Sequence, residues 1–202
     1  MNNVLSIDIE TKNLSHEIGG WGNPHLFKVA CVATWDGNNA TIYSDEGGDS
    51  DLCKSDEATW KPLKELKFDL DDHFQKGGKL LGHNINVFDL PVLRDSMDIY
   101  IVRKYLQEKE DRCIDTSALL TSATGQRIHL DNAVKCTLDT GKLMEGTDAV
   151  VKWRAGQFEE VLKYCISDTK LTYDLWKYGQ ETGIVKYYNA EDDKLNEVKI
   201  KW

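Results

Sequence analysis

The stretch Val4-Leu5-Ser6-Ile7-Asp8-Ile9-Glu10, close to the start of the chain, carries the pattern that decides the fold. Apolar and polar side chains alternate along it, which is typical of a β-strand. Alternate residues of a strand share one face of the sheet. We therefore expect a polar face made by Ser6, Asp8 and Glu10. The opposite, apolar face would be made by Leu5, Ile7 and Ile9.

Asp8 and Glu10 would project side by side from this otherwise apolar strand. Burying two like charges together is costly unless a cation lies between them. Taken alone, the two residues are explained better by a solvent-facing edge strand with two ordinary acids. A metal site therefore needs support from other parts of the chain.

Outward from this strand, short strand patterns alternate with longer helical ones. We expect further strands at residues 27–35, 40–44, 79–82 and 112–116, with a hairpin turn at Asp36-Gly37-Asn38-Asn39. We expect helices at residues 57–75, 91–107, 130–137 and 157–178, the second with Pro91 in its first turn and the last ended by Gly179. Residues 45–56 look like a polar surface loop, and residues 184–202 like a terminal hairpin.

Alternating strands and helices with one early hairpin predict an α/β fold, in which helices flank a mixed five-stranded sheet. The connectivity favours a sheet with the first strand in its centre and the hairpin to one side. We expect residues 1–180 to form one domain, and residues 181–202 to extend the same domain as a hairpin.

The chain has 202 residues and a formal net charge of −9, and 41% of its residues are hydrophobic. This is enough for the core of about one domain. Without an apolar run of roughly 20 residues or a signal-peptide pattern, we expect an intracellular, cytoplasmic protein that does not enter membranes. The five cysteines are scattered and odd in number, as in reduced proteins. The acidic balance argues against a general nucleic-acid binder, but not against an enzyme that holds a strand end through metal ions.

Two further segments carry candidate site residues. Asp89 follows the strand at 79–82, where it could cap a helix or lie at the carboxyl edge of a sheet, where α/β proteins place their sites. Tyr164 and Asp168 lie one helical turn apart and so share a face. Alone, this pair could also be a core tyrosine beside an aspartate at the rim.

Together and in this order, the segments resemble the motifs of the DEDD superfamily of 3′–5′ exonucleases, the DnaQ-like group on an RNase H-like fold. The resemblance covers about residues 4–178. It rests on Asp8-Ile9-Glu10, on Asn84 through Phe88-Asp89, and on Tyr164 with Asp168. The tyrosine marks the DEDDy branch, which contains the proofreading domains of family-B DNA polymerases. The histidine that the DEDDh branch would carry near Lys163 is absent.

The resemblance implies a two-metal-ion hydrolysis of phosphodiester bonds from the 3′ end of single-stranded nucleic acid, with DNA preferred to RNA. It implies two Mg²⁺ or Mn²⁺ ions, with Asp8 bridging them, Glu10 and Asp168 on the water-activating ion, and Asp89 supporting the other. Tyr164 would orient the attacking water, because a phenol with a pKa near 10 is a poor base at neutral pH. Asn84 and Phe88 are candidates for contacting the terminal nucleotide, but Asn84 is explained equally well as a turn residue and Phe88 better as a core residue.

Other interpretations stay open. The chain could be an exoribonuclease of the same fold or an endonuclease of the RNase H or resolvase type. It could also be a non-catalytic module that binds a polymerase or helicase. A replication or repair protein could be a partner in trans. Asp115 is expected near the site, either behind the metal ligands or in a purely structural role, and His83 and His129 are not expected to be ligands. Four basic residues could line a strand path or lie on a solvated face: Lys135, Lys142, Lys152 and Arg154.

Overall fold

The computed structural model describes residues 3–54, 57–141 and 143–202. Within this part of the chain, a six-stranded mixed sheet runs in the order β4-β3-β2-β1-β5-β6. Its strands are β1 (Val4–Thr11), β2 (Val29–Trp35), β3 (Ala40–Ser44), β4 (Ala58–Lys61), β5 (Lys79–Gly82) and β6 (Cys113–Asp115). β2 pairs antiparallel with both β1 and β3, and the other pairs are parallel. The predicted α/β class, the interior place of β1 and the hairpin are confirmed.

Helices cover both faces of the sheet. They are α1 (Asp51–Lys54), α2 (Leu66–Gln75), α3 (Asp89–Ser96), α4 (Tyr100–Gln107), α5 (Lys109–Arg112), α6 (Thr116–Thr124), α7 (Leu130–Leu138), α8 (Gly146–Arg154) and α9 (Phe158–Thr182). Short 3-10 helices lie at Ser15–Ile18, Pro24–Leu26 and Leu63–Glu65. Within the described residues, none of these helices combines the length and apolar character that crossing a bilayer demands.

The two faces of β1 differ as its alternation predicts. Ile7 and Ile9 pack into a core shared with α2, α3 and α4. On the opposite face, the Ser6 hydroxyl donates to the carbonyl oxygen of Thr169 in α9 at 2.8 Å. Residues of β2 and β3 on this second face pack against α8 and α9. The carboxylates of β1 therefore lie on the side that α9 covers.

The region at 57–75 was predicted as one helix, and this is wrong in its first half. Ala58–Lys61 forms β4, which pairs in parallel with β3 and adds a sixth strand to the expected five. Pro62 follows the strand, and the α-helix begins at Leu66. The apolar spacing that suggests a helix belongs to α2 alone. The preceding segment, predicted as loop, contains the short helix α1.

The segment at 91–107 forms two helices, α3 and α4, and not one. They are separated by a turn in which Asp98 has a positive φ of 50°. Helices α6 and α8 were not predicted. The last helix, α9, does not end at Gly179 but at Gly183, which has a φ of 74°. Gly179 instead provides space for the ring of Trp202, which a Cβ at this position would meet at 2.1 Å.

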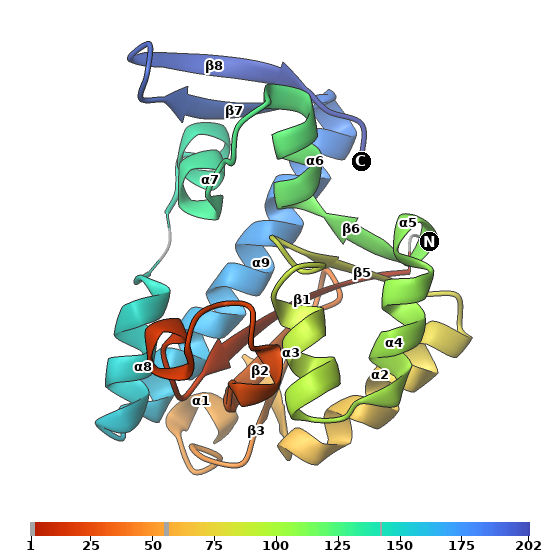
Figure 1. Cartoon of the computed structure of the whole chain (residues 1–202), viewed down its shortest axis with the longest axis vertical. Coiled ribbons are helices and arrows are strands. Elements are labelled where there is room, and N and C mark those ends of the chain that lie inside the picture. Colours follow the sequence, from red (N-terminus) through yellow and green to blue (C-terminus); the bar gives the residue numbers. More distant parts are fainter. Residues whose placement is uncertain (1–2, 55–56, 142) are drawn as a thin grey trace.

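The terminal hairpin is confirmed as β7 (Ile184–Asn189) and β8 (Lys194–Lys199). Figure 1 shows it at the far end of α9 from α8. Its strand β7 packs on α7, and two side chains of that helix bind the strand's backbone. Asn132 exchanges two hydrogen bonds of 2.8 Å with Tyr188, and Thr137 both donates to and accepts from Lys186. These side chains satisfy an edge that would otherwise be open to another strand.

The end of β5 has no space for a larger residue. A Cβ on Gly82 would lie 2.7 Å from the Cβ of the fully buried Ile85. We expect Gly82→Ala to destabilise the fold by about 1–3 kcal/mol, as overpacked cores do. Chemical denaturation of the purified variant measures the change.

The matched control is Gly146→Ala at the first position of α8, where a Cβ meets nothing within 4 Å. This change should be neutral or stabilising by less than about 1 kcal/mol. Equal losses for the two variants would contradict the packing argument.

Candidate active site

Three separate elements bring the predicted residues to one end of β1. Asp8 and Glu10 lie on β1, Asp89 begins α3, and Tyr164 and Asp168 lie on α9. A direct contact joins the first two elements, because the backbone N–H of Ile9 donates to Asp89 Oδ1 at 3.2 Å. The pairing of β5 with β1 ends at Ser6, so Asp89 takes an N–H further along the strand. Asp89 therefore lies against the backbone between the two carboxylates of β1.

Helix α9 meets Asp8 through Cys165. The Cys165 Sγ lies 3.5 Å from the carbonyl oxygen of Asp8 and 3.7 Å from its Oδ2. Burial, the neighbouring Cys31 thiol and the Asp8 carboxylate raise the pKa of Cys165, so the group stays a thiol and can donate. This contact places the Asp8 carboxylate beside the turn of α9 that carries Tyr164 and Asp168.

The pKa of the Tyr164 phenol depends on the carboxylates around it. Its side chain is buried, and burial raises the pKa of the phenol well above 10. The negative charges of Asp168, Glu10 and Asp8 raise this pKa further. In the metal-free protein the phenol is therefore neutral at physiological pH. It can donate a hydrogen bond but cannot act as a base.

The carboxylates sit in a largely dry environment. Asp89, Asp168 and Glu10 are buried, and Asp8 is half-buried. Their oxygens are hard ligands of the kind that Mg²⁺ and Mn²⁺ prefer. In the described ranges, however, no three His, Cys, Asp or Glu side chains already form a group that could hold a metal ion. The donor chemistry fits a hard divalent cation, and coordination would require the side chains to turn toward it.

Glu10 lines the first of two adjoining cavities, which we call together the cleft. The first has a volume of about 390 Å³ and is lined by Glu10, by residues of the segment after β1, and by Gly146 and Val150 of α8. The second has a volume of about 580 Å³ and is lined by Asn84, Val87 and Arg127 among others. Both are lined by Trp21, Phe88 and His129.

An aromatic cluster divides the two cavities. The ring centroid of Trp21 lies 5.2 Å from that of Phe88 and 5.9 Å from that of Phe27. Trp21 is 68% exposed, whereas Phe88 is half-buried. Phe88 and Asn84, the two candidates for contacting a nucleotide, lie in the cleft wall. Trp21, His129 and Arg127 were missed. The one available signal for Trp21 was a tryptophan in a glycine-rich segment, Gly19-Gly20-Trp21-Gly22.

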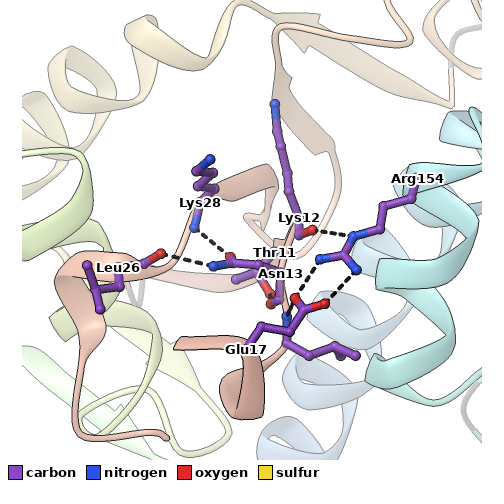
Figure 2. A network of polar contacts seen from close by, with 8 residues as sticks. Thr11, Lys12, Asn13, Glu17, Leu26, Lys28 and Arg154 are labelled. Carbon is purple, nitrogen blue, oxygen red and sulfur yellow. Dashed lines mark hydrogen bonds and ion pairs between the residues drawn. The ribbon is translucent and has the colours of Figure 1, made fainter. Parts of the chain in front are cut away.

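An ion pair ties the walls of the first cavity together (Figure 2). The guanidinium group of Arg154 in α8 donates to both carboxylate oxygens of Glu17, at 2.8 and 2.6 Å. Its Nε donates to the carbonyl oxygen of Lys12 at 2.9 Å. Glu17 also accepts from the backbone N–H of Leu14. Arg154 therefore fastens the segment that follows β1 to α8.

The structure shows where three of the four basic residues considered for a strand path lie. Arg154 is committed to Glu17, and Lys152 pairs with Glu160. Lys135 is exposed on α7. Lys142 lies outside the described residues. Arg127, which is not one of these four, does line the cleft.

The histidines differ in their surroundings. His83 lies 2.9 Å through Nδ1 from the Thr116 hydroxyl and 3.0 Å through Nε2 from the carbonyl oxygen of Ile128. These contacts give it a structural role at the start of the loop that carries Asp89. His129 precedes α7 and lines both cavities.

No protein-family model matches the chain, and no curated protein matches it in sequence. The assignment of a function therefore depends on the residues and their geometry.

The Arg154–Glu17 contact predicts an acid titration. Hydrogen bonds from Arg154 and then from Leu14 lower the pKa of Glu17 from 4.5 to about 2. Because this pKa is depressed in the folded chain, its contribution to stability is present above pH 4.5 and is lost as the pH falls toward about 2. Carboxyl carbon shifts in NMR should show this low pKa directly.

Arg154→Gln should return the pKa of Glu17 toward 4.5, because the main cause of the shift is removed. Arg103→Gln, which removes a different exposed arginine paired with Asp98, should leave Glu17 unchanged. A Glu17 pKa near 4.5 in the unaltered protein would exclude the ion pair in solution.

Proposed function

We propose that the chain is a metal-dependent phosphodiesterase and, more specifically, a 3′–5′ exonuclease that acts on single-stranded ends, with DNA preferred to RNA. The observation that carries the proposal is the meeting of β1 and α9, where the Asp8 carboxylate lies 3.7 Å from Cys165, the residue after Tyr164, and where the charges of Glu10 and Asp168 also act on the Tyr164 phenol. Asp89 joins them through its hydrogen bond to β1. The resemblance of these residues and their order to the DEDDy motifs supports the same activity.

The carboxylates would hold two divalent ions, which supply a nucleophilic hydroxide near neutral pH and relieve charge on the departing oxygen. Asp8, Glu10 and Asp168 are the candidate direct ligands, with Asp89 supporting one ion. Tyr164 has a different role, since a phenol with an ordinary pKa near 10 is a poor base at neutral pH. It can hold the attacking water by a hydrogen bond and fix the direction of attack.

The cleft supports a single strand as the substrate. The Trp21 and Phe88 rings can stack on unpaired bases, a mode of binding that tolerates any base sequence. Arg127 provides positive charge for the backbone in a chain that is acidic overall. The aromatic cluster lies between the carboxylate end and the wider cavity, so a strand end could pass it on the way to Glu10.

The direct test uses oligonucleotides labelled at one end, of DNA and of RNA, with Mg²⁺ and with Mn²⁺. A block at the 3′ end should prevent digestion, whereas a block at the 5′ end should not. Faster digestion of RNA would indicate the exoribonuclease. Nicking of closed circular DNA would indicate an endonuclease, and no hydrolysis with either metal would contradict the proposal. Activity confined to a complex would point to a replication or repair partner.

Asp8→Ala should abolish hydrolysis and leave the fold intact. The variant loses a candidate ligand and also a negative charge that lies close to other carboxylates, so we expect the melting temperature of the metal-free protein to be unchanged or raised. Near-native hydrolysis by the purified variant would show that the site has been assigned to the wrong residues.

Tyr164→Phe should slow the single-turnover rate by about 10²-fold or more, because the variant keeps the ring and loses a positioned hydroxyl. Metal and oligonucleotide affinity should change little. The variant should also keep the shape of the pH–rate profile up to about pH 10, since the phenol does not titrate in that range.

Tyr105→Phe is the matched control. Tyr105 is also fully buried and donates its hydroxyl to the carbonyl oxygen of Leu70, in the core on the other face of the sheet. Its removal should affect stability and not rate. If the two variants behave alike, Tyr164 is a packing residue.

A further inference from the structure

Asp115, at the end of β6, holds together two parts of the backbone. Its Oδ1 accepts from the N–H of Asn84 at 2.9 Å and from that of Ala118 at 3.1 Å, and its Oδ2 accepts from Asn86 at 3.1 Å. The residue is only 3% exposed. The bond to Ala118 is an ordinary cap of α6. The other two bonds reach 29 and 31 residues back along the chain.

These two bonds hold the loop that leads to Asp89. Asn84 has a φ of 73°, a left-handed conformation that is uncommon for residues other than glycine. Its carbonyl oxygen accepts from the N–H groups of Val87 and Phe88, which closes a tight turn directly before α3. Such a turn persists only when surrounding contacts determine it. Asp115 provides two of those contacts from a neighbouring strand.

Thr116, the residue after Asp115, also holds the loop that follows β5. The Thr116 hydroxyl donates to the carbonyl oxygen of Gly82 at 3.2 Å and lies 2.9 Å from Nδ1 of His83. The loop is thus bonded to the end of β6 at both its start and its middle. Its other end is Asp89, whose Oδ1 accepts from Ile9.

We propose that Asp115 is a positioning residue of the active site: by holding Asn84 and Asn86, it sets the loop that places Asp89 against β1 and Phe88 in the cleft wall. The consequence for catalysis rests on the proposed exonuclease function, whereas the positioning itself does not. The competing explanation is that Asp115 only caps α6.

The variant that separates these explanations is Asp115→Ser. Serine is a good N-cap and can still accept from Ala118, but one short hydroxyl cannot also reach the two loop amides. Asp115→Asn is the second variant. It can cap α6, but its single amide oxygen cannot replace both carboxylate oxygens, so at least one loop bond is lost.

The first measurement is amide hydrogen exchange in the metal-free protein, without substrate. The amide of Ile9 reports whether Asp89 is in place, because Asp89 is its acceptor. Asp89→Ala gives the largest acceleration that loss of this acceptor can cause. We expect both Asp115 variants to speed exchange at Ile9 by about 10-fold or more, relative to amides between β2 and β3.

The control is Asp36→Asn in the hairpin turn between β2 and β3. Asp36 also accepts from two backbone amides, those of Asn38 and Asn39, but lies away from the site loop. This change should leave Ile9 unaffected. If Ile9 exchanges normally in Asp115→Ser while Asp89→Ala accelerates it, Asp115 is a helix cap and the proposal fails.

The second measurement is the Mn²⁺ concentration that gives half-maximal hydrolysis. Residues that orient metal ligands typically change metal affinity or activity by 10–100-fold. We expect the Asp115 variants to need about 10-fold more Mn²⁺ and to recover most of their turnover at saturation. A loss of turnover without a change in metal requirement would overturn the positioning role. A wild-type protein without hydrolysis would reject the proposed function, and the exchange data would still decide the role of Asp115.

Discussion

Two carboxylates on an interior strand are the constraint on which the rest of the structure depends. A strand covered by helices on both faces normally carries apolar residues throughout, but β1 presents Asp8 and Glu10 to α9. Helix α9 meets them with Tyr164 and Cys165, and not with large aliphatic groups alone. Nearer the start of the strand, Ser6 is bonded to the backbone of α9. The strand and helix thus pack closely at one end and leave polar groups at the other.

The short length of β5 follows from the same constraint. Because its pairing with β1 ends at Ser6, the chain can turn away at Gly82 and return as the first turn of α3. Asp89 then occupies the edge of β1, where a longer β5 would have placed backbone. A strand that continued past Gly82 would complete the sheet but exclude the fourth carboxylate. The absence of space at Gly82 and the left-handed turn at Asn84 are local consequences of this sharp exit.

The sequence predicted those elements whose signals are local. Without knowledge of the fold, the sequence predicts the alternation in β1, the turn at Asp36–Asn39 and the termini of β3 and β5. It also predicts the shared helix face of Tyr164 and Asp168. The missed features depend on contacts between distant segments. β4 pairs with β3, and Gly179 lies within α9, where it leaves space for the ring of Trp202. Trp21 follows no periodic pattern, and its place beside Phe88 results from tertiary packing alone.

Two side chains outside the motifs, those of Arg154 and Asp115, hold the segments around the candidate site, and we call their bonds tethers. The segment after β1 is bonded to α8 by Arg154, and the loop after β5 is bonded to β6 by Asp115. Both segments line the cleft and neither belongs to the sheet. These side-chain bonds hold them in addition to apolar packing, such as that of Ile85 and Phe88 in the core around Ile7. On the other face, Ile7 and Ile9 pack into an apolar core that includes neither tether. A change in that core should lower stability as a whole, whereas loss of a tether should alter the cleft first. Buried apolar packing thus supports both faces of β1, and the side-chain bonds of Arg154 and Asp115 act in addition on the segments that line the cleft.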